Sequence, residues 1–359
     1  MTSTAHPQLS IIIPTLNEAV ALPLLLADIH AQRGLTFEVI VGDGGSTDTT
    51  EAAARAGGAR FVRARRGRGA QMTDAARLAC GVYLLFLHAD SRLEAPFLLF
   101  DALQSLREAM RPSSRVAGHF SLRFQRTDSD NNWAYQFMEA KTRLNRVNTT
   151  NGDQGFLLTR QWFFELGGFD ARLPFLEDQR LAEQIRNQGR WITLPGVLST
   201  SARRFETEGF HRRYLSMGLI MVAFSTGLEG FFTRLPGLYR FQHQCGRLLL
   251  SPILIGFFVT LFSGVRFRGI VARVRRLGGY LAENTWQPFF YIDVCLQMVS
   301  GRHGLVVLPL YDRWFAPVLN HRVVVLVIGW GAVLLFAGLV TPIVWLAEWW
   351  QQRRRLGQC

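Results

Sequence analysis

The sequence predicts an α/β domain with a mostly parallel sheet flanked by helices, followed by a helical, membrane-associated region. Short apolar runs alternate with helical stretches from residue 9 onward. The runs are continuous and rich in β-branched residues, which is typical of parallel strands covered on both faces. Residues 323–347 form an uncharged, almost wholly apolar run, longer than the roughly 20 residues that a helix needs to span a bilayer.

The elements follow in order along the chain. We expect strands at 9–16, 37–43, 59–64, 83–90, 116–124, 152–159 and 191–199. We expect helices at 17–31, at 46–56 with Ser46 or Thr47 as the N-cap, at 70–80, 96–110, 130–146 and 176–189, and from about 208. In such sheets ligands bind outside the carboxyl ends of the strands, where Pro14–Glu18, Asp43 and Asp90 are predicted to lie.

The charge of the chain is positive and unevenly placed. The formal net charge is +13, and Lys141 is the single lysine. The excess is concentrated in residues 241–359, which carry 12 basic and four acidic side chains. A basic, apolar C-terminal third favours anionic lipid headgroups over nucleic acid as a partner, with a solvated basic surface as the plain alternative.

The chain divides by composition into a catalytic domain at 1–240, a basic amphipathic or interfacial helical region at 241–322, and a transmembrane helix with a basic tail at 323–359. Residues 248–265 are borderline for a membrane span, and 266–281 resemble a basic amphipathic helix lying on a membrane. Trp345, Trp349, Trp350 and Arg353–Arg355 fit an interfacial belt and anchor.

The cysteines and the N-terminus favour a cytosol-facing protein. The four cysteines are far apart, without zinc spacing, and are expected to be reduced and mostly buried: Cys80, Cys245, Cys295 and Cys359. The polar stretch before the first strand lacks the apolar core of a signal peptide.

Seven motifs in order resemble the family 2 glycosyltransferases of the GT-A fold. They are SIIIPTLNEA (10–19), EVIVGDGGSTD (38–48), RGRGAQM (66–72), LLFLHADSRL (84–93), GDQGF (152–156), LGGFD (166–170) and LEDQRLAEQIRNQGR (176–190). The chain is most similar to the short bacterial subgroup linked with radical-SAM or selenodomain proteins. The resemblance ends near residue 240 and implies a Rossmann-like nucleotide-binding half.

The resemblance implies nucleotide-sugar contacts at the first two strand ends. Asp43 is expected to accept a hydrogen bond from the nucleotide base, although it could instead cap the following helix. Pro14, Asn17 and Glu18 match positions that contact the nucleotide, with helix initiation as the alternative for Asn17.

The diphosphate and its metal have their own predicted residues. Arg68, or alternatively Arg66, suits phosphate oxygens because a guanidinium matches them as a planar fork. Asp90 is expected to bind Mg²⁺ or Mn²⁺, which prefer carboxylate oxygens, with a salt bridge or turn cap as the alternative. The family usually has Asp-x-Asp here, so His88 is a departure; we expect it to touch the nucleotide or a water.

The general base and acceptor pocket are predicted further along the chain. In the family the second acid of the Glu177–Asp178 pair deprotonates the acceptor hydroxyl, so Asp178 is the expected catalytic base. Acids also favour a helix N-terminus for electrostatic reasons alone. The acceptor or diphosphate pocket is expected to include Asp153, Glu177, Arg203 and Arg204.

These residues predict an inverting transferase that moves a sugar from a UDP- or GDP-type donor to a hydroxyl or phosphate, on a lipid-linked acceptor. We expect it at the cytoplasmic face of the inner membrane, with membrane lipids but no nucleic acid as partners. Two alternatives remain: a sugar nucleotidyltransferase, although PTLNEA stands where a Gly-rich loop is usual, and a non-catalytic membrane scaffold. A dinucleotide oxidoreductase is disfavoured because no G-x-G-x-x-G follows the first strand.

Overall fold

The computed structural model describes residues 6–127, 132–173, 175–228, 230–232, 234, 248–301 and 304–356. The chain forms two compact units, Met1–Ala202 and Arg203–Cys359. The sequence placed the end of the first domain at 240 instead. The earlier division has a physical reason: helix α9 (Phe210–Thr226) contributes Leu219, Val222 and Ala223 to the apolar core of the C-terminal helices.

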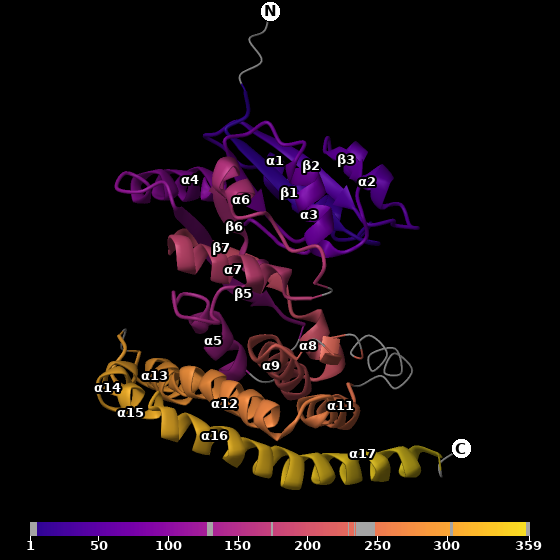
Figure 1. The fold of residues 1–359 in the computed structure, drawn as a ribbon. Coiled ribbons are helices and arrows are strands. Elements are labelled where there is room, and N and C mark those ends of the chain that lie inside the picture. Colours follow the sequence, from indigo (N-terminus) through magenta and orange to yellow (C-terminus); the bar gives the residue numbers. More distant parts are fainter. Residues whose placement is uncertain are drawn as a thin grey trace, which may run out of the picture. The chain divides into compact units, whose positions relative to one another are not determined.

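One mostly parallel sheet organises the first unit, as the sequence predicted. Among the described residues it has seven strands in the order β3-β2-β1-β4-β6-β5-β7. All adjacent pairs are parallel except those of β6, which runs antiparallel to β4 and β5. The strands, visible in Figure 1, are β1 (Leu9–Thr15), β2 (Phe37–Asp43), β3 (Arg60–Arg63), β4 (Tyr83–Phe86), β5 (Val116–Gln125), β6 (Phe156–Thr159) and β7 (Arg190–Ser201).

Helices cover both faces of this sheet, because successive side chains of a buried strand point to opposite faces. Ile11 and Ile13 of β1 pack into one core with α1 and α4, whereas Ile12 packs into a second core with α3, α6 and α7. The helices are α1 (Leu22–His30), α2 (Thr50–Ala56), α3 (Arg68–Ala76), α4 (Leu98–Ala109), α5 (Asn132–Lys141), the short 3₁₀ helix η1 (Gly152–Gln154), α6 (Arg160–Glu165) and α7 (Glu177–Gln188).

Three local predictions were wrong. The strand expected over 83–90 ends at Phe86, and a turn closed by the Ser91 N–H to His88 carbonyl bond of 3.0 Å follows it. The strand expected from 152 begins at Phe156, after η1. The N-cap of α2 is Thr49, and it makes no side-chain cap bond.

The N-cap and helix-start errors have one cause. The Ser46 hydroxyl is already engaged with Asp43, so it does not cap α2. Asn17 has a left-handed φ of +57°, which turns the chain before α1 begins at Leu22. Both residues build the loops above β1 and β2 rather than the helices that follow.

The second unit is helical throughout its described part. Its helices are α8 (Arg203–Glu208), α9, α11 (Ser251–Phe262), α12 (Phe267–Asn284), α13 (Trp286–Ser300), α14 (Val307–Leu310), η2 (Tyr311–Phe315), α15 (Ala316–Leu319), α16 (Arg322–Leu335), η3 (Phe336–Val340) and α17 (Thr341–Leu356). Here η2 and η3 are π-helical turns.

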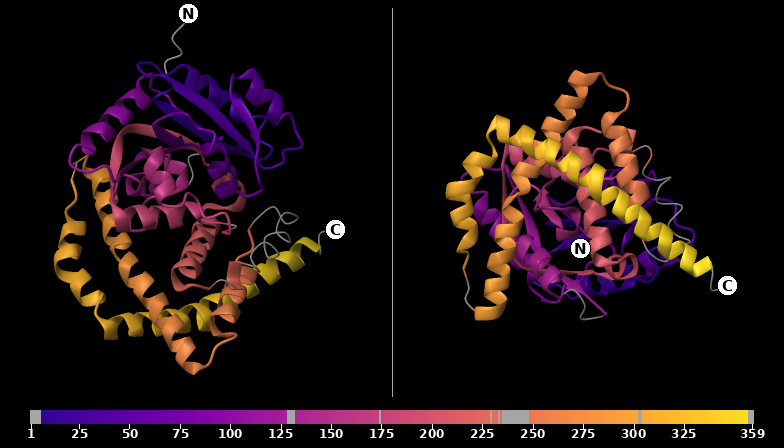
Figure 2. Two further views of the ribbon diagram at one scale, coloured as in Figure 1. Left: turned by 45° about the horizontal axis from the view of Figure 1, so that its top comes forward. Right: turned by 90° about the horizontal axis from the view of Figure 1, so that it is seen from below.

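One helix among the described residues is long and apolar enough to cross a membrane. It runs through α16, η3 and α17 over Arg322–Gln351, with a mean hydropathy of 2.7 and only 11% of its apolar window buried. Figure 2 shows this rod in yellow beside the orange helices of the same unit. The other candidate, Ser251–Phe262, is shorter than the roughly 20 residues that a span requires.

The basic helix α12 is tied into the second unit rather than lying free. The Arg273 guanidinium donates to the carbonyls of Thr260, Leu261 and Ser263 at the end of α11, and Arg276 donates to the Thr226 carbonyl at the end of α9. A cation there satisfies the unpaired carbonyls and the negative end of a helix dipole. Two of the arginines expected on a lipid surface are therefore structural, and the interfacial position of α12 stays a prediction.

The thiols are only partly as expected. Cys80 is exposed rather than buried, Cys295 is partly buried, and both are free. Cys245 and Cys359 lie outside the described residues.

Candidate active site

A cluster of charged residues gathers where the sheet's β4 and β6 meet helices α3 and α7. Asp178 and Glu177 open α7, Arg68 opens α3, and His88 and Asp153 lie in the segments after β4 and within η1. These five residues come from four separate motifs of the sequence. The fold therefore assembles most of the predicted site, at the end of the sheet expected for a parallel α/β fold.

Asp178 is the most distinctive member of this cluster. Its side chain is 6% exposed, and its Oδ2 accepts the Gly152 N–H at 2.7 Å. Its Oδ1 is buried and accepts no hydrogen bond from the part of the chain that the structure describes. A buried carboxylate oxygen without a partner is costly, and such atoms mark places that a proton or a ligand is built to reach.

Backbone geometry helps to aim this carboxylate. Leu176, the residue before the pair of acids, has a left-handed φ of +65°. That conformation is an outlier for a bulky side chain and costs of the order of 1–3 kcal/mol, which functional sites commonly hold. A Cβ at Gly152 would lie 3.2 Å from both Asp178 Oδ2 and His88 Nε2, so a glycine is what lets the two polar groups approach this loop.

The loop that carries Gly152 and Asp153 is held by buried polar contacts. Gln154 is fully buried, and its amide donates to His119 Nδ1 at 2.8 Å, to the Phe120 carbonyl at 3.1 Å and to the Thr142 carbonyl at 3.0 Å. Burial lowers the pKa of His119, so its neutral ring can accept from Gln154. These contacts fix the backbone N–H that binds Asp178.

His88 and Asp153 form a pair within the cluster, with His88 Nδ1 lying 2.7 Å from Asp153 Oδ1. Asp153 is about half exposed, with a side-chain exposure of 49% against 13% for His88. The histidine that departs from the family pattern is thus oriented by an acid from a distant motif. The same-face argument for His88 and Asp90 does not apply, because neither residue is on the strand.

Arg68 and Glu177 form an ion pair in which the acid is almost fully buried. The Arg68 Nε donates to Glu177 Oε1, and the side chains are 42% and 2% exposed. Burial opposes the charge of Arg68, but its pKa is raised by Glu177, Asp178 and Asp153, so the guanidinium stays cationic. Within the described residues its two Nη groups make no hydrogen bond, which leaves donors available beside the acid cluster.

Asp43 lies at the end of β2 and is 3% exposed. Its Oδ2 accepts the N–H groups of Gly45 and Ser46 at 2.9 and 2.8 Å, and its Oδ1 accepts the hydroxyls of Ser46 and Thr15. Burial would raise the pKa of Asp43, but these hydrogen bonds outweigh it and lower the pKa below its ordinary value. The carboxylate therefore also closes its own loop, which is the alternative that the sequence left open.

The residues expected around the base mostly build the rim of this loop. The Asn17 N–H donates to Ser46 Oγ at 2.8 Å, and Asn17 Oδ1 accepts the Thr47 N–H at 2.8 Å. The Glu18 N–H donates to Thr50 Oγ1 at 2.9 Å. Pro14 is buried in β1, paired in register with Gly42. The loops after β1 and β2 are thereby cross-linked into one rim.

Asp90 lies in the turn after β4 and is partly exposed. Within the described residues its carboxylate makes no hydrogen bond or ion pair, and no group of three or more His, Cys, Asp or Glu side chains is arranged to hold a metal. Mg²⁺ is often bound by one or two carboxylates together with substrate phosphates. An open carboxylate on a short turn therefore fits a cation that arrives with a diphosphate.

Arg203 and Arg204 are not placed in this site. They begin α8, the first helix of the second unit. Their predicted contribution to the pocket stays a prediction.

Sequence reasoning missed the Gly152 N–H, the buried support by Gln154 and His119, and the Thr15 hydroxyl on Asp43. The GDQGF motif marked the loop but not which of its atoms would act. A backbone N–H has no sequence signal, so only the fold could identify this donor.

Comparison with known proteins agrees with the motif-based resemblance. Residues 10–166 match the family described as Glycosyl transferase family 2, a stretch that covers most of the sheet but ends before Asp178. The radical-SAM-linked subgroup has no such support.

Among curated proteins, the "PGL/p-HBAD biosynthesis glycosyltransferase" of Mycobacterium bovis (strain BCG / Pasteur 1173P2) is 43% identical over 96 residues, which cover 25% of this chain and 38% of the relative. The same values hold for the protein of that name from Mycobacterium tuberculosis (strain ATCC 25177 / H37Ra). The match thus spans 38% of the length of these relatives.

Solved structures show more distant likenesses. A mannosyltransferase from Pyrobaculum calidifontis in complex with GDP-Man and Mn²⁺ has a TM-score of 0.48 and 19% identity, covering 84% of this chain and 89% of that one. Residues 1–349 of S. aureus TarS in complex with UDP give a TM-score of 0.45 and 15% identity, covering 90% of each chain. The functional proposal rests on the family match and on the geometry of the site.

Proposed function

We propose that this protein is an inverting glycosyltransferase that moves a sugar from a UDP- or GDP-type donor to a hydroxyl or phosphate acceptor. The observation that carries the proposal is the Asp178 carboxylate, with one oxygen held by the Gly152 N–H and the other buried without a partner. It lies in a cluster with the cationic Arg68, at the end of the sheet whose first motifs match family 2.

In this proposal Asp178 is the general base. Its Oδ2 is fixed by Gly152, so Oδ1 is the atom that takes the proton of the acceptor hydroxyl. The hydroxyl oxygen attacks the anomeric carbon as the bond to the nucleoside diphosphate breaks, which inverts the configuration in one displacement. A phosphate acceptor is already anionic and would need only to be positioned.

Arg68 is proposed to bind the donor's diphosphate. Its Nε holds Glu177, and its two Nη groups suit a pair of phosphate oxygens. Asp43 would accept a hydrogen bond from the base, on a rim that Asn17 and Glu18 help to shape. His88, held by Asp153, would contact the bound nucleotide or a water.

Asp90 would hold a divalent cation, Mg²⁺ or Mn²⁺, in contact with the diphosphate. Such a cation supplies neutralisation of the charge that develops on the leaving group. The protein's own contribution is a carboxylate that is otherwise unengaged within the described residues.

The Asp90→Ala variant tests donor recognition and the metal assignment together. We expect wild-type protein to bind its nucleotide-sugar donor at least about tenfold more tightly with Mn²⁺, since the cation bridges Asp90 and phosphate oxygens. In Asp90→Ala this gain disappears, as measured by calorimetric titration with and without Mn²⁺. Asp101→Ala, an exposed acid on α4, serves as the control. A variant that keeps the full Mn²⁺ gain would rule Asp90 out as the ligand.

We further propose that the Arg322–Gln351 helix spans the inner membrane and that the catalytic unit faces the cytoplasm. The length and apolar character of this helix, together with the basic C-terminal third, support this placement. An enzyme anchored in this way would meet an acceptor linked to a lipid. Membrane lipids rather than nucleic acid would then be the partners of the basic residues.

A further inference from the structure

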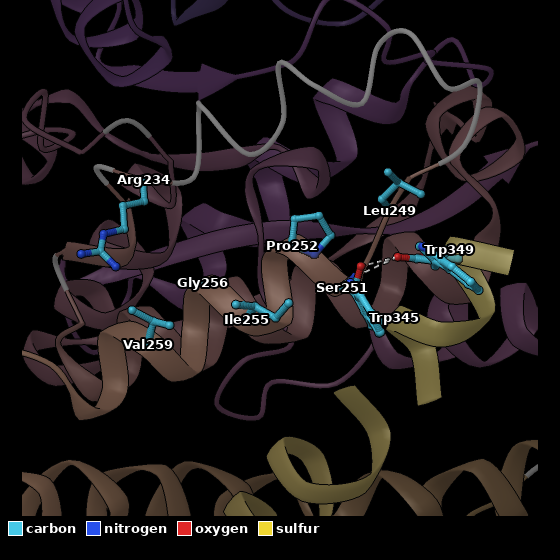
Figure 3. Close-up of a pocket in the computed structure, with 10 residues that line it drawn as sticks. Arg234, Leu249, Ser251, Pro252, Ile255, Gly256, Val259, Trp345 and Trp349 are labelled. Atoms are coloured by element: carbon cyan, nitrogen blue, oxygen red, sulfur yellow. Dashed lines mark hydrogen bonds between the residues drawn. The ribbon is translucent and has the colours of Figure 1, made fainter. Parts of the chain in front are cut away.

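The second unit contains a groove that the sugar-transfer reaction does not explain. It has a volume of about 580 Å³, within the range of small-molecule sites. It lies along α11 and the C-terminal part of the apolar helix (Figure 3) and is lined by Arg234, Leu249, Ser251, Pro252, Ile255, Gly256, Val259, Trp345, Glu348 and Trp349.

The walls of the groove are apolar and open. Ile255 and Val259 on α11 are 43% and 48% exposed, and Trp345 and Trp349 on α17 are 48% and 40% exposed. These two tryptophans lie near the end of the proposed membrane span, where aromatic side chains mark the boundary between hydrocarbon and headgroups. A ligand here would have its apolar part along α11 and a polar part at headgroup level.

The one acidic residue of the lining does not repel an anion. Glu348 is 4% exposed and accepts hydrogen bonds from Arg212 at 2.6 Å, from the Leu250 and Ser251 N–H groups, and from the Ser251 hydroxyl at 2.7 Å. Its charge is therefore balanced by an arginine and by the positive end of α11. The carboxylate acts as a clamp between α17 and α11 and leaves the groove without a free negative charge.

Positive charge stands at both ends of the groove. Arg234 lies at one end in Figure 3, is exposed, and makes no hydrogen bond or ion pair within the described residues. The segment before it is anchored, because the fully buried Phe231 packs on Phe257 of α11 with ring centroids 5.8 Å apart. At the other end the Arg353 guanidinium lies 4.3 Å from the centre of the Trp349 ring.

We infer that this groove is a binding site for an anionic phospholipid, with an acyl chain along Ile255 and Val259 and the phosphate on Arg234. Apolar walls, boundary tryptophans and unpaired guanidinium groups together match a molecule with a hydrocarbon chain and a negative headgroup. The inference uses the proposed membrane position of the apolar helix, but it does not need sugar transfer, since lipid binding is measured without turnover.

Native mass spectrometry of the full chain in detergent tests this site with added phosphatidylglycerol or phosphatidylcholine of identical acyl chains. We expect phosphatidylglycerol to bind at least about fivefold more tightly, which corresponds to about 1 kcal/mol for one cationic side chain. Arg234→Gln removes this preference. Arg275→Gln, which changes the same charge at an exposed position of α12 outside the groove, keeps it.

A second pair of variants tests the groove itself. Val259→Trp fills the groove and lowers the binding of both lipids at least about tenfold. Val327→Trp, at an exposed position of α16 outside the groove, leaves binding unchanged. Equal binding of the two lipids by wild-type protein, or an unchanged preference in Arg234→Gln, would overturn the inference. If Val259→Trp does not fold, the comparison of Arg234→Gln with Arg275→Gln decides alone.

Discussion

Asp178→Asn lowers turnover by about 1,000-fold, within the range of 100- to 10,000-fold that general-base catalysis contributes, while donor binding stays within about twofold of wild type. The amide oxygen can still accept the Gly152 N–H, so the loop that carries Gly152 keeps its shape. What is lost is the oxygen that takes the proton, which is Oδ1, buried and without a partner in the described residues. Initial rates of nucleotide release with acceptor present, beside donor titrations, measure both quantities.

Asp101→Asn provides the matched control, because it makes the same chemical change at an exposed position on α4. It should have wild-type rates. An Asp178→Asn variant with turnover within tenfold of wild type would remove Asp178 from the role of base. A variant that lost donor binding as well would indicate a structural role for the carboxylate.

Gly329→Ala lowers the free energy of unfolding of the second unit by about 1–3 kcal/mol, the usual cost of overpacking, or more. Helices α12 and α16 cross at small residues: a Cβ at Gly329 would lie 2.3 Å from the Val274 carbonyl oxygen. At Gly278, on the other helix, it would lie 1.9 Å from the Val325 carbonyl oxygen. Backbone cannot move aside as a flexible side chain can, so the two helices must separate.

Gly331 is the control for this crossing, since a Cβ there would meet nothing within 4 Å. Gly331→Ala should therefore unfold at the wild-type temperature or slightly above it, because alanine favours the helix. Thermal unfolding of the detergent-solubilised chain, followed by helical circular dichroism, compares the two variants. Equal unfolding temperatures would show that α12 and α16 do not pack as described.

Much of the first unit was predictable because its signals are local. The β-branched run over 37–43 predicted β2 with the observed bounds, and the alternation of strands and helices predicted a mostly parallel sheet. The end of β4 was not predictable, because LHAD continues the apolar run after the strand's hydrogen bonds have stopped. Apolar character measures burial, and a buried turn has the same composition as a buried strand.

The site was predicted as a set of residues but not as a geometry. Family resemblance indicated Asp178 and Arg68, yet the Arg68–Glu177 pair joins residues 109 positions apart. Contacts at such separation depend on the fold. The loop-closing role of Asp43 needed the positions of Ser46 and Thr15, which a strand-end motif does not specify.

The second unit was the least predictable part. Its apolar composition indicated a membrane helix, and one suitable helix is present in the described residues. The crossing at Gly278 and Gly329 and the capping by Arg273 and Arg276 arise from helix packing, which leaves no local pattern. The same arginines had suggested a lipid surface because charge alone does not reveal its partner.

Nucleotide release by the purified full-length chain from UDP-, GDP- and dTDP-sugars, each with Mn²⁺, tests the central claim most directly. We expect one donor class to bind and to release its nucleoside diphosphate slowly, with no pyrophosphate formed at any point. Failure of all three donors to bind would contradict the glycosyltransferase proposal and favour the non-catalytic scaffold. Formation of pyrophosphate from a nucleoside triphosphate and a sugar phosphate would contradict it in favour of a nucleotidyltransferase.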